Sequence, residues 1–119
     1  MNISGKANTL RIFLGEEDHF LHKPVYALIL AEARKAHLAG CSVYRGVMGF
    51  GRDSVVHSSK FLAVSEDMPV VIEIIDEAEK IEEFIPTVKE IFESSDCGGL
   101  VTIQPVEIVH ISSSKKGIN

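Results

Sequence analysis

Apolar and polar residues alternate along several short segments of the chain, which is the pattern of strands with one buried face. Within residues 9–14, Leu10, Ile12 and Leu14 share one side of the predicted strand. Three more segments rich in β-branched or aromatic residues predict strands over residues 41–48, 69–75 and 100–111, the last with a bulge at Pro105.

Two other segments carry apolar residues at helical spacing. The first covers residues 24–38, begins at a proline suited to a first helical turn, and is expected to stop at Gly40. The second follows Asp76, which has the spacing of a capping box with Glu79, and continues through Pro86 because its apolar stripe is strong.

The predicted order is strand, helix, strand, strand, helix, strand. Two strand–helix–strand units with right-handed crossovers predict an α+β, ferredoxin-like sandwich, with an antiparallel four-stranded sheet and both helices on one face. A chain of 119 residues fits one domain, which we expect over residues 9–111, between an N-terminal extension (1–8) and a flexible C-terminal tail (112–119).

Composition narrows the possible functions. Twelve basic and seventeen acidic residues give a net charge of -5, which argues against nucleic-acid binding. No apolar run approaches the ~18 residues of a membrane span, and the start lacks a signal-peptide pattern. Cys41 and Cys97 are too few and too far apart for a metal knuckle or redox pair, so we expect reduced thiols in a cytoplasmic protein.

Chain direction in this fold brings three connections to one end of the sheet. They are the loop over residues 15–23, the long loop over residues 49–68 and the turn at Gly98 and Gly99. Long loops in compact domains are usually functional, so a ligand is most expected at this end.

A glycine cluster leads into the long loop. Gly46, Gly49 and Gly51 lie between Arg45 and Arg52. Glycine permits positive φ and close backbone approach, so successive N–H groups in such a segment can bind an anion. A twisted strand end with a bulge explains the same residues without a ligand.

The sequence RGVMGFG at residues 45–51, followed by LAVSEDMPVVIE at residues 62–73, closely resembles the domain-of-unknown-function 190 family. The resemblance covers residues 10–108. That family resembles the PII-like signalling proteins, which are cytoplasmic homotrimers of ferredoxin-like subunits that bind nucleotides in clefts between subunits. The resemblance therefore implies a homotrimer with a nucleotide ligand.

The resemblance also implies site residues. The sequence Gly49-Phe50-Gly51-Arg52 is similar to the start of the mobile loop in PII proteins, where backbone groups contact phosphates. Glu73 matches a glutamate near the ribose, although a salt-bridged carboxylate on a sheet face is the alternative. The full nucleotide set expected is Arg45, Gly46, Gly49, Phe50, Gly51, Arg52, Glu73, Gly98 and Gly99, with possible loop contacts from Lys23 and His57.

Two departures from PII proteins decide which nucleotide to expect. The basic residues that follow the second helix in PII proteins are absent from this chain, where the sequence is SSDCGG, and the loop lacks the tyrosine-centred modification motif. An AMP-like ligand needs less positive charge than ATP, so AMP is favoured.

The expected function is a non-enzymatic PII-like sensor that binds an adenine nucleotide and regulates a transporter, channel or enzyme through residues 49–68. No cofactor, metal, nucleic acid or membrane insertion is expected. Two alternatives stay open: a trimeric protein-interaction module without a nucleotide, and a divalent-metal-binding trimer of the cation-tolerance type.

Overall fold

The computed structural model describes residues 5–49 and 67–114 of the chain. In chain order, the elements are β1 (Gly5–Gly15), β2 (His19–Phe20), β3 (Lys23–Pro24), α1 (Val25–Lys35), β4 (Cys41–Arg45), β5 (Pro69–Glu77), α2 (Ala78–Ser95) and β6 (Leu100–Ile108). Expectations that fall on residues 50–66, including the proposed site residues Phe50, Gly51, Arg52 and His57, lie outside the described residues.

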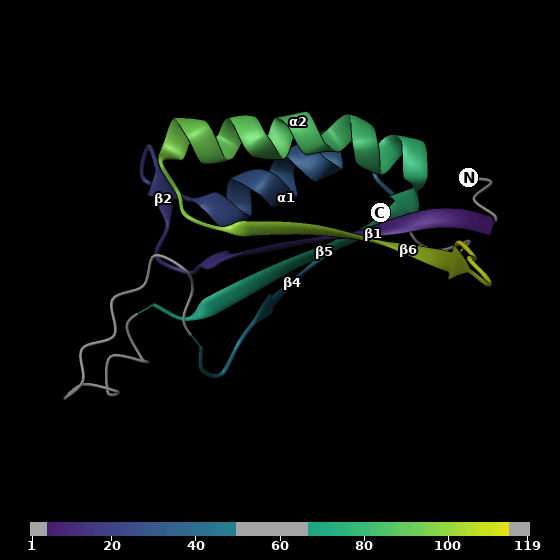
Figure 1. Cartoon of the computed structure of the whole chain (residues 1–119), viewed down its shortest axis with the longest axis horizontal. Helices are drawn as coiled ribbons and strands as arrows, with labels where there is room; N and C mark the ends of the chain where they lie inside the picture. The colour runs from purple at the N-terminus through teal and green to yellow at the C-terminus, as the bar shows by residue number, and fades with distance from the viewer. Residues whose placement is uncertain (1–4, 50–66, 115–119) are drawn as a thin grey trace.

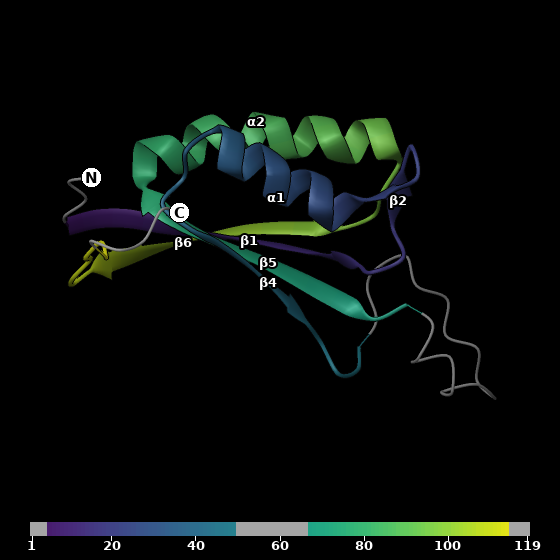
Figure 2. The same cartoon turned by 180° about the vertical axis from the view of Figure 1, so that it is seen from behind.

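The main sheet has the strand order β4-β5-β1-β6, and all neighbouring strands are antiparallel. Both helices lie on the same face of this sheet, as Figures 1 and 2 show from opposite sides. The ferredoxin-like prediction is therefore confirmed. Neither helix of the described residues covers the opposite face, which we call the open face.

The core forms where the helices cover the sheet. Leu10 of β1 lies opposite Ile74 of β5 and Ile103 of β6, and Ile12 lies between Ile72 and Val101 in the same way. Directly paired residues point to one face. The helices contribute the fully buried Val25, Ile29, Ile81 and Val88 to this layer.

Several strands differ in length from the prediction. β1 begins at Gly5 rather than at residue 9, while β4 ends at Arg45 and β6 at Ile108. The bulge expected at Pro105 is wrong, because the register between β1 and β6 is continuous through the Asn8–Pro105 pair. β6 is an edge strand, where a missing N–H on the outer side removes no ladder bond.

The loop after β1 contains a small β2–β3 hairpin that the sequence analysis did not predict. Its two turn residues, Leu21 and His22, have φ of 52° and 68°. A two-residue hairpin of this kind usually carries Asn-Gly, so the sequence gives no turn signal here.

Both helices end on a left-handed residue that is not glycine. α1 ends at Lys35, followed by His37 with φ of 59°, and the Leu38 N–H donates to the Ala33 carbonyl at 3.2 Å. This arrangement is a Schellman motif, so the expected stop at Gly40 is wrong. α2 ends in the same way with Asp96 in the left-handed conformation.

Asp76 does not cap α2 as a capping box would. β5 continues to Glu77, which is the N-cap residue and makes no side-chain capping bond. Asp76 is completely buried, and its carboxylate accepts the Glu77 N–H at 2.6 Å and the Ala39 N–H at 2.8 Å. The carboxylate therefore joins the end of β5 to the connection between α1 and β4.

We expect Asp76→Asn to lower the free energy of unfolding by about 1–3 kcal/mol, because an amide offers one acceptor oxygen where two N–H groups need partners. Urea denaturation of the variant measures this loss. Glu79→Gln, at an exposed residue in the first turn of α2, is the control and should change stability by less than about 0.5 kcal/mol. Equal effects from both substitutions would contradict this role for Asp76.

Candidate functional site

One end of the sheet gathers the loop after β1, the end of β4, the start of β5 and the turn before β6, as the sequence predicted. We call residues 15–18, 45–49, 67–69 and 97–99 together the glycine-rich end. The Glu16 N–H donates to the Met68 carbonyl at 2.8 Å, and the Gly46 N–H donates to the Pro69 carbonyl at 2.7 Å. Backbone hydrogen bonds thus hold the loop after β1 and the end of β4 beside residues 68 and 69 (Figure 1).

Arg45 is the last residue of β4 and forms an ion pair with Glu16. Its Nε and Nη2 lie 3.1 Å and 3.0 Å from one carboxylate oxygen of Glu16. The Arg45 side chain is 63% exposed, whereas Glu16 is 27% exposed. The guanidinium predicted for phosphate binding is therefore present but already shared with a carboxylate.

Other carboxylates lie around this ion pair. Asp67 accepts the Glu17 N–H at 2.9 Å, and Asp18 accepts the Gly15 N–H at 2.8 Å. Their negative charges make the glycine-rich end less attractive to a highly charged anion than its glycines alone suggest.

The glycines of this end serve close packing. A Cβ at Gly46 would lie 2.7 Å from Pro69 Cγ, and one at Gly99 would lie 2.7 Å from the Phe13 carbonyl oxygen. Gly46 and Gly49 do not have left-handed φ, and the Gly46 N–H is already bonded to Pro69. Gly46 therefore contributes shape rather than a free donor, while Gly98 lies in the exposed turn beside Gly99.

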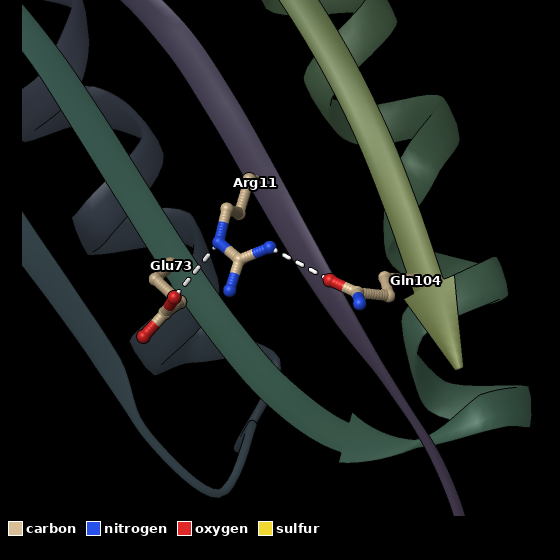
Figure 3. A network of polar contacts seen from close by, with 3 residues as sticks. All are labelled: Arg11, Glu73 and Gln104. Atoms are coloured by element: carbon tan, nitrogen blue, oxygen red, sulfur yellow. Dashed lines mark hydrogen bonds and ion pairs between the residues drawn. The ribbon is translucent and has the colours of Figure 1, made fainter. Parts of the chain in front are cut away.

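Glu73 lies apart from the glycine-rich end, in the middle of β5 on the open face. Arg11 Nε lies 2.9 Å from a Glu73 carboxylate oxygen, and Arg11 Nη1 donates to Gln104 Oε1 at 2.9 Å (Figure 3). These bonds tie β5, β1 and β6 together. Arg45 pairs with Val70, which is three residues, or about 10 Å, from Glu73 along β5. Alternation along the strand places the two residues on opposite faces of the sheet, so one subunit does not bring them together.

The larger of two described concavities also lies away from the glycine-rich end. It has a volume of about 590 Å³ and lies on the open face, between Ser42, Glu73 and Ile75 on one side and residues 106–111 on the other. Its size is in the range of small-molecule sites. Of the predicted site residues that the structure describes, Glu73 alone lines it.

A second concavity of about 380 Å³ lies between α1, α2 and the β2–β3 hairpin. Lys23 lines it together with Phe20, Leu28 and Ile91. The structure therefore separates Lys23 from the other described candidates. Phe50, Gly51, Arg52 and His57 lie outside the described residues.

Sequence reasoning missed the roles of Glu16, Arg11 and Cys97. Glu16 and Arg45 are 29 residues apart, and only their pairing in the fold reveals the contact. Burial first, and then the hydrogen bond and charge of Asp18 and the charge of Asp67, together raise the pKa of the Cys97 thiol to about 12. Across residues 5–49 and 67–114, no group of three His, Cys, Asp or Glu side chains is arranged to hold a metal ion.

Comparison with known proteins identifies the family. The model of the DUF190 family, described as "Uncharacterized ACR", matches residues 7–108. The chain belongs to the DUF190 family. This DUF190 chain is 35% identical over 106 residues to a UPF0166 protein of Aquifex aeolicus, a match that covers 89% of the chain and 96% of the relative. It is 32% identical over 98 residues to a UPF0166 protein of Methanocaldococcus jannaschii, a match that covers 82% of the chain and 87% of that relative.

Solved structures confirm the PII-like fold of this DUF190 chain. CPII, a nitrogen regulatory PII-like protein from Thiomonas intermedia K12, matches with a TM-score of 0.57 and 14% identity in its complex with ADP, AMP and bicarbonate. Its complex with ADP and bicarbonate matches with a TM-score of 0.61 and 16% identity. Each match covers 88% of this chain and 90% of CPII. Neither α1 nor α2, the helices of the described part, is long and apolar enough to cross a membrane.

We expect Cys97 to react with iodoacetamide at pH 8.5 at least about a hundredfold more slowly than in the urea-unfolded chain, because its raised pKa leaves little thiolate. Its rate should keep rising above pH 10. Asp18→Asn should speed the reaction by lowering the pKa, whereas Glu93→Gln, at an exposed α2 residue, should not. Mass spectrometry of the Cys97 peptide gives the rates, and a fast reaction in the folded wild type at pH 8.5 would refute the assignment.

Proposed function

We propose that this DUF190 protein is a PII-like regulatory protein that binds an adenine nucleotide between subunits. The observation that carries the proposal is the gathering of Arg45 and three connecting segments at one end of a PII-like sheet. CPII, which shares this fold, is a nitrogen regulatory protein with bound ADP and AMP. The protein is proposed to be non-enzymatic and cytoplasmic, and to regulate a protein target through residues 49–68.

A site between subunits accounts for the division of the candidate residues. Within one chain, Arg45 and Glu73 lie at different places on the sheet, and the larger concavity contains Glu73 alone of the two. When a second copy packs against the open face, its glycine-rich end can lie next to the Glu73 concavity of the first copy. The nucleotide then contacts the glycine-rich end of one subunit and the Glu73 region of another.

The open face supports self-association of this kind. Tyr44 and Leu100 are 53% and 55% exposed on it, and they flank the half-buried Phe13 and Val71 on the neighbouring strands. Exposed apolar residues gathered on one face are typical of an interaction surface. The proposed assembly is a homotrimer, as in the PII-like proteins that the sequence resembles.

The charges at the glycine-rich end favour AMP over ATP. Glu16, Glu17, Asp18 and Asp67 lie at this end, and Arg45 is the basic residue paired there. Each additional phosphate adds negative charge close to these carboxylates, and the repulsion grows with that charge. A nucleoside monophosphate therefore meets the least electrostatic repulsion from these carboxylates.

Calorimetric titration with AMP and with ATP tests the proposal. We expect saturable AMP binding near one site per subunit, with weaker binding of ATP. Glu73→Gln should weaken AMP binding about tenfold, because hydrogen bonds to a charged carboxylate are stronger than those to an amide. Glu107→Gln removes a carboxylate from the same concavity but from another strand, and it should change the affinity little. No binding of either nucleotide would overturn the function.

We expect the purified protein to run as a trimer in size-exclusion chromatography with light scattering. Tyr44→Asp should reduce the trimer fraction, because it places a charge on the exposed open face. Leu30→Asp, at a 40% exposed residue of α1, introduces the same charge on the helical side and should leave the trimer intact. A trimer that resists Tyr44→Asp but not Leu30→Asp would place the interface on the helices instead.

A further inference from the structure

Glu16 is the described residue most directly placed to influence what Arg45 binds. Its backbone N–H donates to the carbonyl of Met68, the residue before β5, at 2.8 Å, and this bond positions the Glu16 backbone. Arg45 is fixed in turn, because β4 pairs with β5 up to Arg45 and Val70. The ion pair therefore joins two backbone positions that are both held by residues 68–70.

The geometry of the ion pair leaves room for a second anion. Arg45 uses Nε and Nη2, and both contact the same Glu16 oxygen. A guanidinium has five N–H donors, so Nη1 and part of Nη2 are not required by Glu16. Because the Arg45 side chain is 63% exposed, a phosphate can approach these donors while Glu16 stays in contact.

A phosphate bound in this way lies beside the Glu16 carboxylate. One phosphate group gains the attraction of Arg45 and meets the repulsion of Glu16. A chain of two or three phosphates adds further negative charges near the same carboxylate, and the part of the chain that the structure describes supplies no second ion-paired cation at this end. The repulsion then increases with each phosphate, while the attraction of a single guanidinium is already shared.

We infer that Glu16 is the residue that limits the charge of the bound ligand, so that the site of this chain selects a nucleoside monophosphate against a triphosphate. The inference rests on the proposed function and deepens it. It assigns the largest part of the selection to the one carboxylate that touches Arg45, and smaller parts to the other carboxylates of the glycine-rich end.

Glu17 provides a matched comparison on the same loop. Neutralising Glu17 changes the net charge by the same amount as neutralising Glu16. The Glu17 backbone N–H donates to the Asp67 carboxylate. Among the described residues, no ion pair joins the Glu17 side chain to a basic side chain. Glu16→Gln keeps an oxygen that can accept from Arg45 and removes the charge. The two substitutions therefore separate a contact with Arg45 from a general change in potential.

The test is calorimetric titration of wild type, Glu16→Gln and Glu17→Gln with AMP and with ATP at low and at physiological salt. In Glu16→Gln, we expect ATP affinity to rise more than AMP affinity, so that the preference for AMP falls about fivefold at low salt. Glu17→Gln should change it less than about twofold. The difference should shrink at higher salt, because salt screens exposed charges.

Two results would overturn the inference while leaving the proposed function intact. One is an equal change of preference in both variants, which would assign selection to the general potential. The other is an equal loss of both affinities in Glu16→Gln, which would mean that Glu16 only positions Arg45. If the wild type binds neither AMP nor ATP, the proposed function itself fails, and the inference fails with it.

Discussion

The burial of one face of β1 is the constraint on which the rest of the structure depends. β1 pairs with β5 on one side and with β6 on the other, so its residues Leu10 and Ile12 lie at the centre of the apolar layer under both helices. Alternation along a strand then fixes the other face as well. Arg11 must point away from the helices, where it meets Glu73 and Gln104 (Figure 3).

The two faces of the sheet therefore have different roles. The helix-covered face holds nearly all of the buried apolar residues and stabilises the subunit. The open face carries ionic and exposed apolar side chains together with a concavity that is large enough for a small molecule. The glycine-rich end lies where strands of the same sheet begin or finish, so β4 and β5 contribute residues both to this end and to the open face.

Much of the fold could be predicted because hydrophobic periodicity reports burial directly. The strand at residues 9–14 and the helix after Asp76 were both visible in this pattern. Structural details that depend on the backbone conformation of a single residue could not be predicted from this pattern. His37 and Asp96 end the helices in a conformation for which glycine is the usual signal.

The candidate site was predicted only in part, for a related reason. Chain direction alone correctly brought the connections to one end of the sheet. The partner of Arg45, however, depends on how a side chain from a distant loop is oriented, and no spacing in the sequence encodes the contact with Glu16. Likewise, the need for glycine at position 46 arises from the proximity of Pro69, which follows from strand pairing rather than from a local motif.

The short length of β4 has one further consequence. Within the part of the chain that the structure describes, β4 is an edge strand of five residues that is hydrogen-bonded to β5 alone, whereas the nine residues of β5 lie between two neighbouring strands. Local opening of a strand requires less free energy when it has fewer ladder bonds and one free side. The backbone that carries Arg45 can therefore open while β1 and β5 remain closed, and its amide protons exchange with solvent ahead of those in the centre of the sheet.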